Sequence, residues 1–108
     1  MTELPRNGEI WWCEPPQLSR RPAVVMSRNH AIEGTGRVMV APCSTRVRGL
    51  PTEVLLEPGE DPVIEACCVQ LDGVTSVSVA ELTGRLGILS PDRNRSVCAA
   101  LEVAVNCP

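Results

Sequence analysis

Two short segments of the sequence contain arginines and hydroxyl groups, which are side chains that bind and polarise a phosphodiester. The first segment has Arg20 and Arg21 directly before Pro22. The proline restricts Arg21 to an extended backbone at the start of a predicted strand, so its guanidinium is held near the surface. The second segment has Ser44 and Thr45 directly after another predicted strand. Arginine forks and hydroxyl donors are the groups that a phosphodiester and its pentacoordinate transition state require.

These residues also have an ordinary structural explanation. Arginines beside loops are usually solvated, and hydroxyl residues after a strand usually cap a turn. The two segments form one site only if their strands are neighbours and both loops lie at the same end of the sheet. In that case Arg46, which follows the hydroxyl pair, adds another positive charge to the site.

The segments that must position these residues are predicted to be short strands. Apolar runs bounded by proline, glycine and serine predict strands. They cover residues 9–13, 22–27, 37–43, 52–56, 63–71 and 85–89. Residues 14–21 are predicted to form a loop and residues 34–36 a turn, while Pro42 marks a strand end or an edge strand. Residues 78–82 are compatible with a single helical turn.

The C-terminal segment is the one with a helical pattern. Ser90 is a good N-cap residue, Pro91 suits the first helical position, and Asp92 is favourable in the first turn. Apolar residues then recur at helical spacing, at Val97, Ala100, Leu101, Ala104 and Val105. Short strands followed by one amphipathic helix predict a mainly β fold, a small and strongly bent β-barrel capped by the C-terminal helix. Without repeats or linkers, residues 1–108 are predicted to form a single domain.

Composition narrows the class of protein. With 108 residues, of which 44% are hydrophobic, the chain can bury a real core. It has no long apolar run and its first eight residues carry no export signal, so we expect no membrane span and a cytoplasmic location. The six cysteines are therefore expected to be reduced. No CxxC is present and His30 is the one histidine, so we expect no metal site and no cofactor.

The charge is unevenly distributed along the chain. Residues 1–50 contain seven arginines and four glutamates, a net charge of +3, whereas residues 51–108 contain three arginines and nine acidic residues, a net charge of −6. A protein with a net negative charge is a poor non-specific binder of polyanions. A local concentration of arginines still predicts a phosphate-facing patch in the first half.

Six segments, taken together and in order, resemble the PemK/MazF family of toxin endoribonucleases. They are GEIWW at 8–12, RRPAVVMS at 20–27, VMVAPCST at 38–45, RGLPTEVLLEPGE at 48–60, VQLD at 69–72 and LTGRLGILSP at 82–91. The resemblance implies the plasmid-maintenance toxin barrel, which is related to Src-homology-three-like barrels, and a homodimer. It also implies a cognate antitoxin as partner, whose acidic and apolar tail would fold on the arginine-lined groove.

The resemblance further implies a reaction on single-stranded RNA at short sequence motifs, without a metal. The ribose 2′-hydroxyl attacks the adjacent phosphate, usually leaving a 2′,3′-cyclic phosphate and a free 5′-hydroxyl. Because the nucleophile belongs to the substrate, DNA cannot be cleaved.

Residue by residue, the resemblance places the catalytic arginine of the family on Arg21. The family's hydroxyl residue after the third strand is usually a threonine; its place falls on Ser44, with Thr45 beside it. The acid that serves as base in some members falls on Asp72, although Gly73 replaces the glutamine that usually follows. A guanidinium keeps its proton in proteins, so we expect Arg21 to neutralise charge on the phosphate rather than to transfer a proton.

Five further residues are candidates for binding RNA: Arg20, Arg46, Arg48, Trp12 and Gln70. Trp11 and Trp12 are adjacent on a strand and must face opposite sides, so at most one belongs to the core. The other could stack on a base or pack in a dimer contact. Cys67 is expected to be buried in a strand interior, with Cys68 on the opposite face.

Two alternatives of other classes stay open. One is a gyrase inhibitor of the same fold, although the inhibitors of the CcdB type depend on an aromatic C-terminal tail and residues 105–108 contain no aromatic residue. The other is a non-cleaving RNA-binding or regulatory barrel, which the departures at Ser44 and Gly73 allow.

Overall fold

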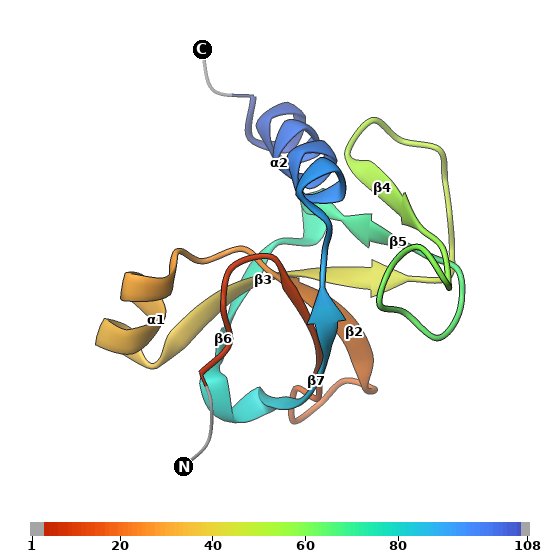
Figure 1. Cartoon of the computed structure of the whole chain (residues 1–108). Coiled ribbons are helices and arrows are strands. Elements are labelled where there is room, and N and C mark those ends of the chain that lie inside the picture. The colour runs from red at the N-terminus through yellow and green to blue at the C-terminus, as the bar shows by residue number, and fades with distance from the viewer. Residues whose placement is uncertain (1–3, 107–108) are drawn as a thin grey trace.

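Seven strands form one curled antiparallel sheet around which the helices are placed (Figure 1). The computed structural model describes residues 4–106. The strands are β1 (Glu9–Cys13), β2 (Arg21–Val25), β3 (Arg37–Ser44), β4 (Glu53–Leu56), β5 (Cys67–Gln70), β6 (Thr75–Ser78) and β7 (Leu82–Ile88). Their order is β4-β5-β3-β2-β1-β7, with β6 also paired to β3. Within residues 4–106 no registered pairing joins β7 to β4 or β6, so the curled sheet is open on that side.

Strand β3 has two partners on one of its edges. Residues 37–40 pair with β6, whereas Cys43 and Ser44 pair with β5. Pro42 lies between these two stretches, where its missing N–H interrupts neither pairing. The prediction that Pro42 marks a strand end or an edge strand is therefore wrong, because β3 continues to Ser44 and has partner strands on both edges.

The central strands bury both of their faces, which explains why they read as nearly continuous apolar runs. Ile10 and Val24 belong to a core beneath the C-terminal helix. Their neighbours Trp11, Ala23 and Val25 belong to a second core on the opposite face, which also contains Val77 of β6. Trp11 and Trp12 thus face opposite sides as predicted, with Trp11 only 8% exposed in the second core.

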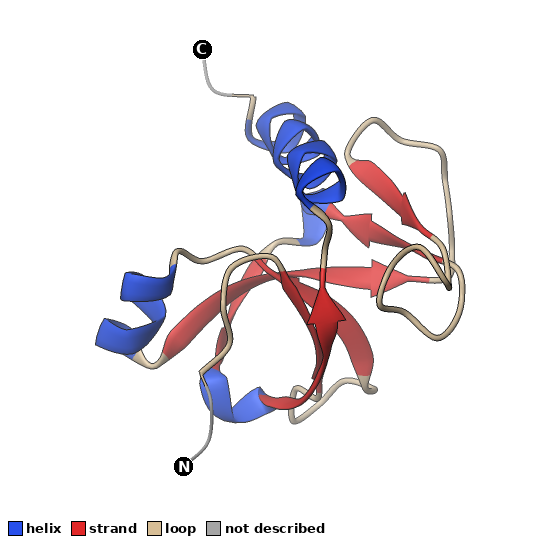
Figure 2. Cartoon of the chain, in the orientation of Figure 1, coloured by secondary structure: helices blue, strands red, loops and turns tan. Residues whose placement is uncertain are grey.

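The C-terminal helix is confirmed as α2 (Pro91–Val105), and Figure 2 shows it at one end of the sheet. The Ser90 hydroxyl caps it by accepting a hydrogen bond from the Arg93 backbone N–H at 3.1 Å. Val97 and Ala100 of the predicted apolar stripe are buried, whereas Val105 at its end is 56% exposed. The predicted mainly β fold with a C-terminal helix is confirmed.

A short helix, α1 (Asn29–Thr35), occupies the place of the predicted turn at residues 34–36. It buries Ile32 in the second core and ends at Gly36, whose φ of 66° is the left-handed conformation that glycine adopts without strain. His30 lies on this helix with its side chain exposed. Two short 3₁₀ turns follow later, η1 (Leu71–Gly73) and η2 (Val79–Glu81), the second within the predicted helical turn.

The starts of β5 and β7 differ most from the sequence prediction, and one strand was not predicted. Residues 63–66 do not extend β5, because the N–H groups of Asp61 and Val63 are satisfied inside the preceding loop, by Glu57 O at 2.9 Å and Asp61 O at 2.8 Å. Strand β7 begins at Leu82, earlier than predicted, and passes through glycines that obscure its pattern. Strand β6 is short and polar, and its pairing with β3 was not predicted.

The structure also bears on the predicted state of the cysteines and on the predicted absence of a membrane span. Four of the five cysteines that the structure describes are buried, Cys67 and Cys68 included, and all five are free thiols. Cys107 lies outside the described residues. Among residues 4–106 there is no helix long and apolar enough to cross a membrane.

A buried carboxylate connects β1 with β7. Glu9 accepts hydrogen bonds from Trp11 Nε1 at 3.0 Å, from the Arg6 backbone N–H at 2.7 Å and from the Arg85 guanidinium. Burial by itself raises the pKa of the Glu9 carboxyl, but these donors outweigh burial and hold the pKa below its ordinary value. The charged form of Glu9 therefore stabilises the fold.

We predict that Glu9→Gln lowers the free energy of unfolding at neutral pH by about 1–3 kcal/mol, the contribution of hydrogen bonds to a charged group. Because folding lowers the pKa of Glu9, this stabilisation is complete above the ordinary value of 4.5 and is lost as the pH falls through the folded value. Urea unfolding of both proteins at neutral pH and near pH 3 checks this. An equal difference at both pH values would contradict it.

Candidate functional site

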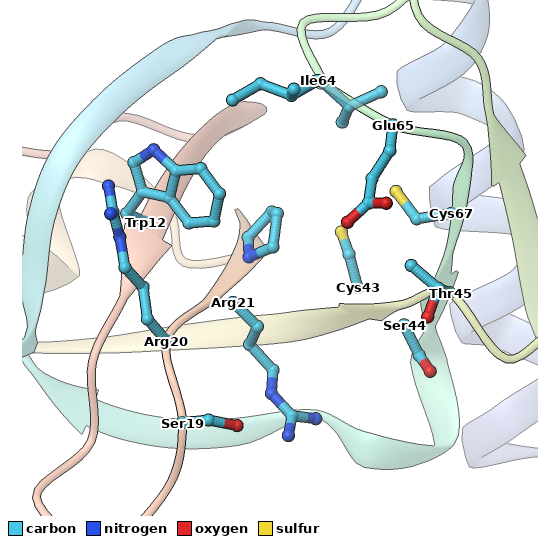
Figure 3. A pocket seen from close by; sticks show the side chains of 12 residues that line it. Trp12, Ser19, Arg20, Arg21, Cys43, Ser44, Thr45, Ile64, Glu65 and Cys67 are labelled. Carbon is cyan, nitrogen blue, oxygen red and sulfur yellow. The ribbon is translucent and has the colours of Figure 1, made fainter.

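A cavity of about 510 Å³ lies where β2 begins and β3 ends (Figure 3). Because β2 and β3 are antiparallel, with Ala23 opposite Pro42, the start of β2 and the end of β3 meet at the same edge. The cavity is lined by Trp12, Ser19, Arg20, Arg21, Pro22, Cys43, Ser44, Thr45, Val63, Ile64, Glu65 and Cys67. The structure thus brings the arginine segment and the hydroxyl segment together, as the sequence analysis required.

The Ser44 hydroxyl is oriented by the backbone that follows it. Its Oγ accepts a hydrogen bond from the Arg46 N–H at 3.1 Å. This is the turn-capping interaction expected of a serine after a strand. It leaves the Ser44 hydroxyl hydrogen available to a ligand, so the capping role and a binding role are compatible. Figure 3 shows the Arg21 and Ser44 side chains extending to the same side of the cavity.

Trp12 forms one wall of the cavity together with an arginine. The Arg20 guanidinium carbon lies over the indole, 4.0 Å from the ring centroid. This cation–π contact holds the two side chains side by side and covers one face of the indole. Trp12 and Arg20 therefore form this wall of the cavity together.

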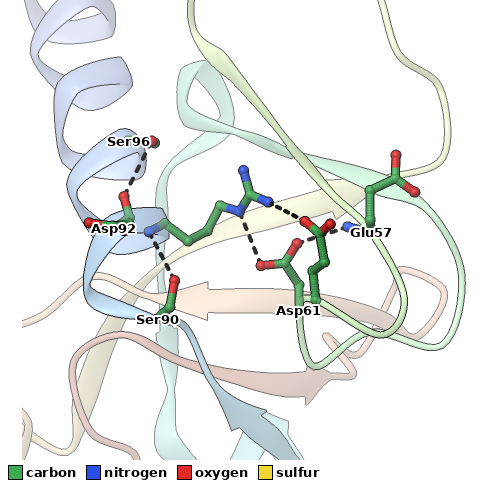
Figure 4. A network of polar contacts seen from close by, with 7 residues as sticks. Glu57, Asp61, Ser90, Asp92 and Ser96 are labelled. Carbon is green, nitrogen blue, oxygen red and sulfur yellow. Dashed lines mark hydrogen bonds and ion pairs between the residues drawn. The ribbon is translucent and has the colours of Figure 1, made fainter.

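The opposite wall is the loop between β4 and β5, and α2 fixes that loop in place (Figure 4). The Asp61 side chain is 2% exposed, and its Oδ1 accepts a hydrogen bond from Arg93 Nε at 3.1 Å. Its other oxygen accepts from the Glu57 backbone N–H at 2.9 Å. Asp61 thereby links α2 to the loop and closes the turn between residues 57 and 61.

A close contact with β7 fixes the same loop from below. A Cβ atom on Gly87 would lie 2.5 Å from the Pro62 Cβ, closer than side chains approach one another. Gly87 is required here because the proline ring packs directly on the strand. Val63 follows and is buried in the first core, so the segment that leads into the cavity wall is anchored on three sides.

Two thiols form the floor of the cavity. A hydrogen bond to Cys67, with burial, raises the pKa of Cys43 well above its ordinary value. The same hydrogen bond lowers the pKa of Cys67. Both thiols belong to the cavity lining. Their position beside Ser44 means that substitutions at these cysteines alter the shape of the site.

Three other candidate residues line a separate, smaller hollow of about 230 Å³. They are Arg48, Gln70 and Asp72. Asp72 Oδ2 accepts a hydrogen bond from Thr52 Oγ1 at 2.6 Å, which ties η1 to the start of β4. Asp72 does not line the cavity of Arg21, so the structure divides the predicted catalytic residues between two hollows. Among the described lining residues of both hollows, Arg46 does not occur.

The loop between the two hollows is shaped by Glu53. Its Oε1 accepts hydrogen bonds from the backbone N–H groups of Arg48 at 3.0 Å and Leu50 at 3.1 Å. These backbone hydrogen bonds lower the pKa of the Glu53 carboxyl, and the one from Leu50 has the largest effect. The carboxylate therefore sets the course of the loop that carries the arginines at 46 and 48.

The departure at Gly73 has a local explanation. A Cβ atom at this position would lie 3.1 Å from Pro42 Cγ. The glycine lets η1 approach β3 closely at the proline, so a side chain in place of Gly73 would push the Asp72 hollow away from β3. Gly73 and Pro42 are accommodated as a pair.

Ile64 and Glu65 are cavity residues that the sequence analysis missed. The prediction of a strand over residues 63–71 placed them in a regular, half-buried element. The charged Glu65, three residues after Pro62, was the available signal of a loop.

Comparison with known proteins assigns the family. The family of PemK-like, MazF-like toxins of type II toxin–antitoxin systems matches residues 6–105. A probable endoribonuclease MazF5 of Mycobacterium tuberculosis is 56% identical over 107 residues, covering 99% of this chain and 98% of that protein.

Solved structures agree with this assignment. An endoribonuclease from a mycobacterial species, in complex with its cognate antitoxin, has a TM-score of 0.86 at 26% identity, covering 96% of this chain and 97% of that one. MazF from Deinococcus radiodurans, at 24% identity, shares the fold with a TM-score of 0.84, covering 98% and 100%. The fold is that of these small toxin structures. The chain belongs to the PemK/MazF family of toxins of type II toxin–antitoxin systems.

We predict that Asp61→Asn lowers the free energy of unfolding by about 1–3 kcal/mol, because Arg93 loses a buried charged partner. Glu60→Gln is the matched control, since the Glu60 carboxylate is 75% exposed and pairs with the same arginine at 3.5 Å. We expect less than about 1 kcal/mol for the control. Denaturant unfolding measures both, and equal losses would contradict the anchoring role of Asp61.

Proposed function

We propose that this toxin is a metal-independent endoribonuclease that cleaves single-stranded RNA at specific short sequences and thereby inhibits translation and growth. The observation that carries the proposal is the meeting of Arg21 with Ser44 and Thr45 in one cavity at the edge of β2 and β3. The relatives named endoribonucleases support it.

The chemistry uses a nucleophile that the substrate supplies. The ribose 2′-oxygen attacks the adjacent phosphorus and the bond to the 5′-oxygen breaks. The 2′-hydroxyl loses its proton and the leaving 5′-oxygen gains one. The products are a 2′,3′-cyclic phosphate and a 5′-hydroxyl end, so neither water nor a metal is needed for this step.

Arg21 and Ser44 stabilise the charge that develops on the phosphate. The Arg21 guanidinium binds the non-bridging oxygens as a fixed cation and keeps its own proton. The Ser44 hydroxyl, oriented by the Arg46 N–H, donates a hydrogen bond to the same group. Thr45 lines the same cavity and is the second hydroxyl donor.

The second hollow extends the RNA contact beyond the scissile phosphate. Arg48 and Gln70 offer hydrogen-bond donors to phosphate and base oxygens there. Arg46, on the loop between the hollows, adds positive charge along the backbone of the strand. Asp72 accepts a hydrogen bond from the Thr52 hydroxyl, and we place it among the residues of this hollow that contact RNA.

The partners follow from the same surface. We infer that a cognate antitoxin covers the arginine-lined cavity with an acidic and apolar segment, that the toxin acts as a homodimer, and that it works in the cytoplasm. The similar structure with a cognate antitoxin supports the first inference. The excess of seven arginines over four glutamates in residues 1–50 provides the charge complementarity.

We predict that Arg21→Ala reduces RNA cleavage by about 100- to 1,000-fold, the effect of removing one donor from a preorganised oxyanion site. The measurement is incubation with a long mixed-sequence RNA and its DNA copy in EDTA, followed by mapping of the ends. Wild type should yield discrete RNA fragments with 5′-hydroxyl ends and leave DNA intact.

Arg95→Ala is the matched control, because the Arg95 side chain is 72% exposed on α2 and lies outside both hollows. It should cleave as wild type does. If the folded wild-type protein cuts no RNA, the ribonuclease proposal fails in favour of a non-cleaving or gyrase-inhibiting barrel.

We predict that Asp72→Asn reduces cleavage by no more than about 10-fold, the loss of one ordinary hydrogen-bond contact. The reason is its place in the second hollow rather than beside Arg21. The pH dependence of the cleavage rate of this variant should keep the shape of the wild-type profile. A loss as large as that of Arg21→Ala, with an altered profile on the acidic side, would instead make Asp72 the proton acceptor.

A further inference from the structure

The cavity that contains Arg21 is too large to be explained by a phosphate alone. Its volume of about 510 Å³ lies in the range of sites for whole small ligands. Figure 3 shows Arg21 and Ser44 extending to one side, and Ile64 and Glu65 next to each other across the cavity. The phosphate chemistry uses the first side and leaves the second without a role.

The second side has the surfaces that hold a nucleobase. Arg20 covers one face of Trp12 at 4.0 Å and so directs base stacking to the other face. Ile64 is 74% exposed although it is a large apolar residue, and it follows directly on the buried Val63. An indole and an exposed isoleucine at the rim of one cavity are suited to hold a flat, unpaired base.

Glu65 supplies the polar contact. Among the described residues that line this cavity it is the one carboxylate, and Figure 3 shows its side chain directed inward. A carboxylate accepts two hydrogen bonds side by side and donates none. The Watson–Crick edge of guanine presents two adjacent donors, N1–H and the N2 amino group. Adenine, cytosine and uracil each present one donor next to an acceptor, so they cannot satisfy both oxygens.

We propose that Trp12, Ile64 and Glu65 bind one unpaired guanine of the RNA next to the phosphate held by Arg21 and Ser44, and that Glu65 selects guanine over the other bases. The inference rests on the proposed function for its substrate class and deepens it. The loop that carries Ile64 and Glu65 is fixed by the Asp61–Arg93 pair and by the contact of Pro62 with Gly87. It is therefore rigid enough to discriminate.

Binding is tested without cleavage. The probes are fluorescent hexanucleotides of deoxyuridine with guanine, adenine or cytosine at one central position, which lack the 2′-hydroxyl. We expect wild type to bind the guanine probe about 10- to 100-fold more tightly than the others in anisotropy titrations at one fixed ionic strength.

Glu65→Gln decides which residue is responsible. A glutamine presents one acceptor and one donor, so the variant should lose the guanine preference and gain affinity for adenine relative to wild type. Glu57→Gln is the matched control, since Glu57 is exposed in the same loop but does not line the cavity. It should keep the wild-type preference. Circular dichroism verifies that both variants are folded.

Three results would overturn the inference: equal affinities of wild type for the three probes, no measurable binding of any probe, or a guanine preference that survives Glu65→Gln. Mapping of cleavage sites in the mixed RNA separates this inference from the proposed function. Cleavage without a guanine at any fixed position near the cut refutes the guanine site alone. A guanine preference in binding without cleavage of RNA refutes the ribonuclease alone.

Discussion

The antiparallel pairing of β2 with β3 is the constraint on which the site depends. It places Ala23 opposite Pro42, so the residues before β2 and those after β3 leave the sheet at the same edge. The guanidinium of Arg21 and the hydroxyl of Ser44 are thus brought to one cavity although 23 positions separate them in the sequence. A slip of one residue in this register would send Ser44 to the opposite face of the sheet, because side chains alternate along a strand.

The other wall of the cavity depends on α2, which has no side chain in the cavity. Arg93 in the first turns of the helix binds the buried Asp61 carboxylate, and Val97 packs in the same core as Val63. The helix therefore fixes the loop between β4 and β5 against the sheet. The stability of the fold and the shape of the cavity are coupled here, since a change in the packing of α2 moves the residues that face Trp12.

Local patterns predicted the parts of the structure that local chemistry determines. The sequence predicted the N-cap at Ser90 and the opposite faces of Trp11 and Trp12. It also predicted that the arginine and hydroxyl segments meet if their strands are neighbours. The helix α1, the strand β6 and the irregular residues 63–66 were not, because each is decided by a distant partner: Ile32 enters the second core, β6 pairs with β3, and Asp61 binds Arg93. Ile64 and Glu65 were missed for the same reason, since their loop is defined by tertiary contacts rather than by its own pattern.

The proposed chemistry explains why an arginine and two hydroxyl residues, Arg21, Ser44 and Thr45, meet in the cavity. When the substrate supplies its own nucleophile, the protein has to hold the phosphate, stabilise the developing charge and exclude unsuitable bases. In the proposed reaction, permanent cations and hydroxyl donors perform the first two tasks, and a serine in place of the family's usual threonine retains the hydroxyl that this requires. The carboxylate of Glu65 would weaken phosphate binding if it lay beside Arg21. On the opposite wall it faces the base instead, so one cavity combines positive charge for the backbone with an acceptor for recognition.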